Sequence, residues 1–329
     1  MPLGGRSRHG CCKIGTHQMI IVGGKNAERK YLSSGAIYDV RTEQWMLLPN
    51  DMPEDRSGCN VVNDGNYVYV IGGTGAHNSS VNTVFRLSLG TLKWNTMATM
   101  GTERSDFAAV LKGSYIYAFG GVGIKNSSSI FGAVLASVER YSIVDNSWVA
   151  LPEMVKERAG HCAVTTAIGR VIYIVGGNSC SKACVEHMPS LERFDTVSLC
   201  WKSERNLIDM PECRSEAPTV MLGNRYLVAI GGFCKMGRAV ASCLIFDCIF
   251  NRWASTPAPI DMSTARGFHT AVVLDGNIIV AGWHKEENVS YMELISTRDL
   301  LEFAPVIYPL PIFYYNRILQ IGKPNDENI

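Results

Sequence analysis

The sequence predicts an all-β repeat protein of six units, each built from four short antiparallel strands. Two observations lead to this fold class. An apolar run that ends in glycine recurs along the chain, and in most copies an arginine precedes it and a tryptophan follows it. The runs end at Gly24, Gly73, Gly121, Gly177, Gly232 and Gly282. Neighbouring copies lie roughly 50 residues apart, and a unit of that length must stack on its neighbours to bury a core.

The first and second strands of each unit are predicted on either side of a glycine turn. The first strand begins after a recurring arginine, at positions 6, 56, 104, 158, 214 and 266. Small residues follow several of these arginines, as in Ser57-Gly58, which suits strands crowded around an axis. The second strand is the β-branched and aromatic run that ends in Gly-Gly.

The third and fourth strands are predicted from a constant spacing. A third-strand residue is followed by tryptophan seven positions later in five units, where the pairs are Tyr38–Trp45, Leu87–Trp94, Tyr141–Trp148, Phe194–Trp201 and Phe246–Trp253. Leu294 and Leu301 occupy the same positions in the last unit. We therefore expect four strands in unit six as well.

The combined pattern of arginine, apolar-Gly-Gly, third-strand aromatic and tryptophan resembles the kelch family. The stretch 137–161 is similar to the kelch domain of kelch-like proteins, with Glu139-Arg140-Tyr141, Trp148 and Arg158. The resemblance implies a six-bladed kelch β-propeller over residues 1–305. The repeats are expected at about 1–50, 51–99, 100–153, 154–208, 209–260 and 261–305. We expect the ring to close without strand exchange, and the tail 306–329 to pack its aromatics on the propeller rather than form a seventh blade.

Alternating strand directions place the B–C loops (second to third strand) and the D–A loops (fourth strand to the next unit) on one face. From the second glycine to the third-strand residue the spacing is 14, 14, 20, 17 and 14 in units one to five. From tryptophan to the next arginine it is 11, 10, 10, 13 and 13. Variable loops on a rigid repeat scaffold usually carry recognition. We therefore predict that this loop face binds a partner.

Candidate partner-binding residues on that face are aromatic, basic or apolar, as interface anchors often are. They are Arg8, Arg29, Tyr31, His77, Ile130, Phe131, Phe233, Arg238, Trp283 and His284. An alternative for Ile130 and Phe131 is that they fold back onto the third blade. The six repeat arginines are better explained as structural, although a ring of cations for an acidic peptide is the alternative. Arg8 differs because only unit one has this extra arginine.

Two further groups of residues are considered for chemistry. Cys180, Cys184 and His187 form C-x3-C-x2-H, which offers three clustered ligands where a structural zinc needs four. Whether they bind metal stays open, and Cys162, Cys200 or Cys213 are candidates for the fourth ligand. His9, His161 and His269 follow the repeat arginine by three residues, which favours a structural role.

Composition narrows the function. Hydrophobic residues make up 47% of the 329 and charged residues 19%, with a net charge of +1, so no electrostatic nucleic-acid surface is expected. No apolar run is long enough to cross a membrane, and the N-terminus lacks an apolar signal segment. We expect a cytoplasmic protein whose eleven cysteines are mostly reduced. Oligomeric state is left open.

The resemblance implies a protein-interaction module or scaffold. Its expected roles are substrate recognition for a ubiquitin ligase or binding of a cytoskeletal protein such as actin. Kelch-like proteins carry a BTB domain before the propeller. This sequence has neither a BTB domain nor an F-box, so it stays open whether the chain is a fragment of a longer protein that carries one. The alternative is a kelch-type enzyme, a sugar epimerase or a metal-dependent one. Iron-dependent specifier proteins of the kelch type carry a glutamate, an aspartate and a histidine in the pattern E-x3-D-x3-H. This pattern does not occur here, so we expect no catalytic residues and no cofactor.

Overall fold

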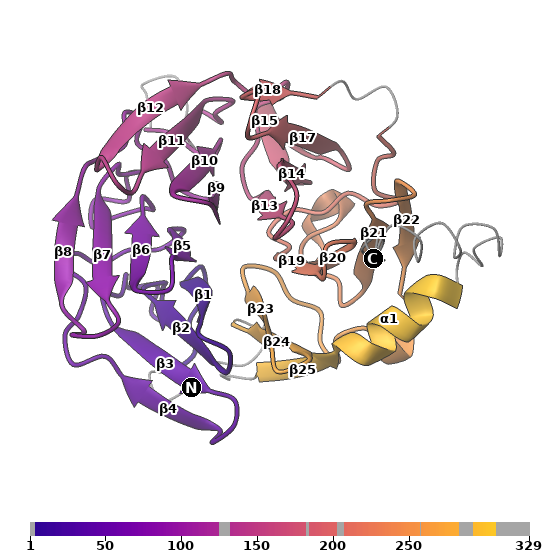
Figure 1. The fold of residues 1–329 in the computed structure, drawn as a ribbon, viewed down its shortest axis with the longest axis horizontal. Coiled ribbons are helices and arrows are strands. Elements are labelled where there is room, and N and C mark those ends of the chain that lie inside the picture. The colour runs from indigo at the N-terminus through magenta and orange to yellow at the C-terminus, as the bar shows by residue number, and fades with distance from the viewer. Residues whose placement is uncertain are drawn as a thin grey trace, which may run out of the picture.

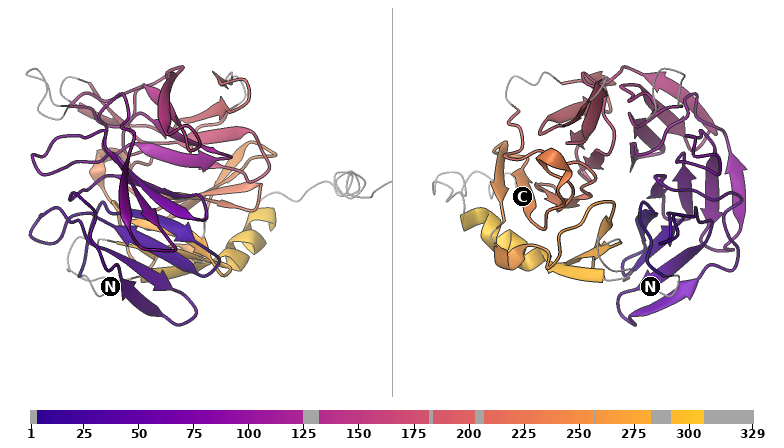
Figure 2. Two further views of the ribbon diagram at one scale, coloured as in Figure 1. Left: turned by 60° about the vertical axis from the view of Figure 1, so that its left-hand side comes forward. Right: turned by 180° about the vertical axis from the view of Figure 1, so that it is seen from behind.

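The chain forms a ring of six β-sheets around a central axis, and this confirms the predicted six-bladed kelch propeller (Figure 1). The structure, a computed structural model, describes residues 4–124, 132–181, 184–202, 207–256, 258–282 and 292–306. The sheets are antiparallel and their strands follow chain order, with the first strand of each blade nearest the axis. Figure 2 shows the same ring from the side and from behind.

Five blades have four strands each. Blade one contains β1 (Gly10–Ile14), β2 (Gln18–Val22), β3 (Gly35–Asp39) and β4 (Gln44–Leu47), and blade two contains β5 (Asn60–Asn63), β6 (Tyr67–Ile71), β7 (Val84–Ser88) and β8 (Trp94–Met97). Blade three contains β9 (Ala108–Lys112), β10 (Tyr115–Phe119), β11 (Val138–Ser142) and β12 (Ser147–Leu151). Blade four contains β13 (Cys162–Thr165), β14 (Val171–Val175), β17 (Leu191–Asp195) and β18 (Cys200–Trp201), with a separate hairpin of β15 (Asn178–Ser181) and β16 (Cys184–His187). Blade five contains β19 (Thr219–Leu222), β20 (Tyr226–Ile230), β21 (Cys243–Asp247) and β22 (Arg252–Ser255), with short helices η1 (Lys235–Gly237) and η2 (Ala258–Ile260).

Blade six corrects one prediction. Its sheet has three strands among the described residues, namely β23 (Thr270–Leu274), β24 (Asn277–Ala281) and β25 (Met292–Ser296). The fourth strand expected around Leu301 is wrong, because Thr297–Val306 form helix α1. The Ser296 hydroxyl accepts a hydrogen bond from the Asp299 amide at the start of this helix. Leu300 is fully buried against the blade, so the helix packs an apolar side chain one position before the predicted strand residue Leu301.

The tryptophan spacing is explained by the outer hairpins. Tyr38 and Trp45 lie directly opposite each other on β3 and β4, with ring centroids 4.9 Å apart. The indole N–H of Trp94 donates to the Asn50 carbonyl of the preceding blade at 3.1 Å, and Trp148 donates to the Ala98 carbonyl at 3.0 Å. Trp201 and Trp253 make the same bond to Pro152 and Ile208. Tryptophan therefore covers its own blade and also fixes the blade before it.

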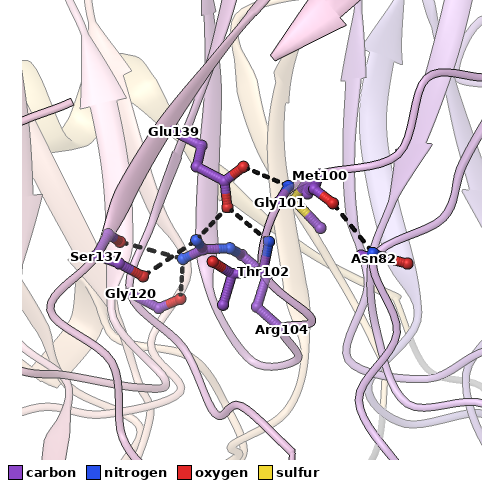
Figure 3. A network of polar contacts seen from close by, with 8 residues as sticks. All are labelled: Asn82, Met100, Gly101, Thr102, Arg104, Gly120, Ser137 and Glu139. Carbon is purple, nitrogen blue, oxygen red and sulfur yellow. Dashed lines mark hydrogen bonds and ion pairs between the residues drawn. The ribbon is translucent and has the colours of Figure 1, made fainter. Parts of the chain in front are cut away.

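The repeat arginines are structural, as the sequence favoured. All six side chains are buried, with no more than 2% of the residue exposed. Arg104 donates to the Gly120 and Ser137 carbonyls at 2.7 and 3.1 Å and to a Glu139 carboxylate oxygen at 2.7 Å (Figure 3). Glu139 also accepts from the Gly101 and Thr102 amides. Each such arginine thus joins the inner D–A segment to the B–C loop of the same blade.

The ring closes between blades one and six. β1 pairs with β2 of its own repeat and also contacts β23. The Arg8 amide donates to the Phe268 carbonyl at 3.1 Å across this junction. The prediction of closure without strand exchange therefore holds for the described strands. The predicted packing of the tail concerns residues that, beyond 306, lie outside the described ranges.

Candidate functional site

Six equivalent residues surround the axis, each two positions after a repeat arginine. This axial ring consists of Arg8, Gly58, Asp106, Gly160, Glu216 and Phe268. All six have φ between 50° and 61°, the left-handed region that favours glycine. Backbone hydrogen bonds of 2.7–3.1 Å link them in order from Phe268 through Arg8 to Glu216, each amide donating to the carbonyl of the preceding blade. The backbone is thus uniform, while the side chains differ.

The two glycines of the axial ring leave room for acidic side chains. A Cβ atom on Gly58 would lie 2.5 Å from an Asp106 carboxylate oxygen, and one on Gly160 would lie 2.5 Å from a Glu216 carboxylate oxygen. Each carboxylate therefore lies over the glycine of the blade before it. Larger residues at 58 or 160 would displace these acids from the axis.

Arg8 connects the axis to the rim of the loop face. Its guanidinium forms an ion pair with Asp106 and lies over the Phe268 ring, 5.0 Å from the centroid. The carboxylate of Asp106 raises the pKa of Arg8 above its ordinary value. Phe268 in turn contacts Phe233 edge to face, with centroids 5.1 Å apart. Two residues predicted separately as partner anchors, Arg8 and Phe233, thus belong to one continuous row.

The axial ring borders a cavity of about 250 Å³. The residues that directly precede the inner strands line it as well, among them His9, His161 and His269. Burial is the main cause that lowers the pKa of His9 and His269 to about 3, and it lowers that of His161 as well, so these imidazoles are neutral. His9 Nε2 lies 2.9 Å from the Thr270 hydroxyl. The two rings of His161 and His269 make no hydrogen bond of normal geometry within the described part of the chain.

Glu216 is the acidic group of the cavity that lacks a salt-bridge partner among the described residues. Burial, and then the neighbouring charge of Asp106, raise its pKa to about 8, against the opposing effect of Arg8. The side chain is therefore largely protonated at neutral pH in the free protein. A cationic neighbour would favour its ionised form.

The rim of the loop face is formed by the B–C loops. The Tyr31 hydroxyl donates to the Asn78 side-chain carbonyl at 2.6 Å, which ties loop one to loop two, and the Lys25 ammonium lies 4.4 Å from the Tyr31 ring centroid. Arg29, His77 and Arg238 are exposed. The remaining predicted anchors, Ile130, Phe131, Trp283 and His284, lie outside the described residues.

Bridges between backbone segments join the two kinds of loop. Ser7 pairs with Lys25, and Ser215 pairs with Phe233, so each D–A segment contacts the B–C loop of its own blade. This is the shared face that the strand directions predicted. The role of its residues in partner binding stays a prediction.

Sequence reasoning missed Asp106, Glu216 and Phe268. A signal was present, because aligning the six repeats on their arginine gives Arg, Gly, Asp, Gly, Glu and Phe two positions later. The repeat pattern singles out Arg8 as an extra arginine and Gly58 and Gly160 as small residues, and it assigns no role to the other three. The partner of Arg8, Asp106, is 98 residues away in sequence, so the ion pair appears only when the ring is closed.

Metal binding by the cysteine and histidine motif is not tested by the described side chains. Cys180 and Cys184 belong to the β15–β16 hairpin, where Ser181 lies opposite Cys184, and their side chains lie outside what is described. His187 Nδ1 lies 2.9 Å from the Ser215 hydroxyl. Among the side chains that the structure describes, no group of three potential ligands is placed to hold a metal ion. Within the same ranges, the helices are too short or too polar to cross a bilayer.

A family model described as the Attractin/LZTR1 β-propeller matches residues 19–290. Kelch domain-containing protein 10 of Homo sapiens is 30% identical over 146 residues, which cover 42% of this chain and 33% of that protein. An F-box/kelch-repeat protein of Arabidopsis thaliana is 37% identical over 73 residues, 22% of this chain and 20% of the relative. Kelch-like protein 41a of Danio rerio is 29% identical over 160 residues, 48% of this chain and 25% of the relative. The matched stretches thus span a third or less of these relatives.

Proposed function

Because the chain belongs to the Attractin/LZTR1 β-propeller family, and thereby to the kelch-type propellers, we propose that it is a protein-interaction module whose partner binds the loop face. The observation that carries the proposal is the row from Phe233 through Phe268 and Arg8 to the axial cavity. Aromatic and arginine side chains of this kind supply most of the binding energy in protein interfaces.

The repeat scaffold supports this placement. Function on repeat proteins usually lies in residues that differ between copies on a common backbone. The axial ring has one backbone conformation and four kinds of side chain besides glycine. Around it, Arg29, Tyr31, His77 and Arg238 supply a polar rim, as expected of an interface.

Two biological roles fit a module of this kind. One is substrate recognition for a ubiquitin ligase, since one relative is named an F-box/kelch-repeat protein. The other is binding of a cytoskeletal protein such as actin. Both roles require a protein partner that binds the loop face. We propose a cytoplasmic location together with them.

Site-specific photo-crosslinking tests the proposed face. A photoreactive residue is placed at Arg238 on the rim, and in a second protein at Asn66, an exposed turn residue of blade two on the opposite face. We expect partner adducts in cells from position 238 that disappear when Phe233→Ala is added. Adducts from position 66 with none from 238 would overturn the proposal.

A further inference from the structure

The axial cavity is lined by two acidic side chains, Asp106 and Glu216, and one basic side chain, Arg8. Arg8 is engaged by Asp106 and by the face of Phe268, and the three lining histidines are neutral. Glu216 then remains as an acid with no ion-pair partner in the part of the chain that is described. An anionic guest would meet the carboxylate of Asp106 and would oppose the ionisation of Glu216. An apolar guest would bury Glu216 further without a partner, which costs free energy.

The lining histidines do not offer hydrogen bonds to a guest. His161 and His269 are 7% and 5% exposed, and their ring nitrogens are buried. The carboxyl groups of Asp106 and Glu216 line the cavity, and an ionised carboxylate offers only acceptors. These two groups suit a guest that carries several donors.

The size of the cavity limits the guest. Its volume of about 250 Å³ corresponds to roughly eight water molecules at about 30 Å³ each. Pockets for drug-sized molecules begin at about 300 Å³. The cavity has room for one long side chain.

We propose that the axial cavity receives one cationic side chain of the partner protein, an arginine or a lysine, whose charge pairs with Glu216 and Asp106. The inference rests on the proposed function and specifies which group of the partner lies at the centre of the loop-face interface. The guanidinium has five N–H donors and the ammonium three, which match the acceptor oxygens of the two carboxylates. The apolar stem of such a side chain would lie along Phe268. The left-handed backbone at Asp106 and Glu216, where glycine would be least strained, is typical of residues kept for function.

A peptide selection tests this inference without a known partner. A display library of random 12-residue peptides is selected on the full chain, on E216Q, and on E28Q. Glu28 is an exposed acid of loop one, 67% accessible and paired with Lys30, so E28Q controls for loss of one negative charge on the same face. Peptides that Phe233→Ala weakens are retained as binders of the loop face. We expect them to share an arginine or lysine at one position.

The decisive measurement is a thermodynamic cycle that compares the affinities of one retained arginine peptide and its citrulline analogue for each protein variant. Citrulline is isosteric with arginine and neutral. Citrulline should lower affinity at least tenfold on the wild type and on E28Q, and less than twofold on E216Q. An equal loss on E216Q, or retained peptides without a common cation, would overturn the cationic guest and leave the loop-face interaction intact. Failure to recover any peptide sensitive to Phe233→Ala would count against both proposals.

A second readout serves if E216Q does not fold. Binding of a cation ionises Glu216 and releases a proton, so affinity of the wild type for the arginine peptide should rise from pH 6 to pH 8.5. The other charged or titratable groups that line the cavity are Asp106, Arg8, the histidines at 9, 161 and 269, and the cysteines at 11, 59 and 162. Burial raises the pKa of these three thiols above the pH range of the measurement. The citrulline peptide should show no such rise. Parallel pH profiles for both peptides would contradict the proposal.

Discussion

Two positions in each repeat, only two residues apart, differ in how much the residue type varies between the six repeats. The first is always arginine, buried, and bonded within its blade. The second is the axial ring, where the chain places Arg, Gly, Asp, Gly, Glu and Phe on one backbone conformation. The first position stabilises every blade in the same way, so repetition there indicates structure. The second lines the cavity, so its variation between repeats fits the partner binding proposed above.

The largest effect is expected at the invariant position. Arg104→Ala leaves Glu139 buried without its counter-charge and leaves the Gly120 and Ser137 carbonyls without this donor. Breaking a buried pair typically costs about 3–5 kcal/mol. We expect a loss of that size in the free energy of unfolding, measured by urea denaturation.

The matched control is Arg238→Ala, an exposed arginine of the loop face. It should change stability by less than about 0.5 kcal/mol. Equal losses for the two variants would remove the distinction between buried repeat arginines and surface ones.

Glu216 should make the protein less stable as pH rises. Its pKa is about 8 in the folded chain and ordinarily 4.5. The folded state therefore holds the proton more tightly, and this contribution to stability is full below pH 4.5 and is lost as pH rises through 8. One pKa unit corresponds to about 1.4 kcal/mol, and solvent in the cavity reduces the total, so we expect about 1–3 kcal/mol between pH 5 and 8.5.

The measurement compares wild type with E216Q in denaturant at both pH values. Subtraction removes the opposite contribution of His9, His161 and His269. Their lowered pKa values make stability increase as pH rises towards 6.5, and this contribution is constant above that pH. The stability of E216Q relative to wild type should increase with pH. A constant difference would mean that Glu216 ionises normally.

Much of the fold follows from local sequence. The seven-residue spacing determines an outer hairpin in which Tyr38 lies opposite Trp45, and the run 19–22 is fully buried as its apolar character predicts. Helix α1 is not predicted from the repeat pattern, because Leu301 aligns with the tryptophans of the other units and favours a fourth strand, although nearby residues such as Glu302 favour a helix.

The site was less accessible to sequence reasoning than the fold. Arg8 and Asp106 meet only because six blades bring distant loops to one axis, and no spacing along the chain encodes that distance. Phe268 acquires its role from two neighbours, Arg8 and Phe233, in different blades. Such residues are identified by comparing equivalent positions between repeats and asking where a shared backbone carries unlike side chains.

A reciprocal exchange sharpens the contrast within the axial ring. Glu216→Gly introduces the residue that blades two and four carry at this position. It removes the strain of a non-glycine residue in the left-handed region, so the free energy of unfolding should rise by about 1 kcal/mol. Gly58→Ala should destabilise by a similar amount, because its Cβ would meet the Asp106 carboxylate at 2.5 Å. Thermal unfolding compares both with wild type. If Glu216→Gly lowered the stability, the side chains of the axial ring would stabilise the fold as the repeat arginines do, and the distinction between the two positions would be lost.

The smallest effect is expected in the turns on the opposite face. Asn66 is exposed between β5 and β6, and its backbone amide and carbonyl, rather than its side chain, make the turn hydrogen bonds with Asp64 and Leu89. Asn66→Asp should therefore leave affinity for a peptide selected on the loop face unchanged within twofold, and change stability by less than about 0.5 kcal/mol. Phe233→Ala in the same titration should weaken binding by about 2 kcal/mol if it is an interface anchor. A silent Phe233→Ala beside a strong effect of Asn66→Asp would place recognition on the turns instead, and the axial ring would then owe its variety to something other than binding.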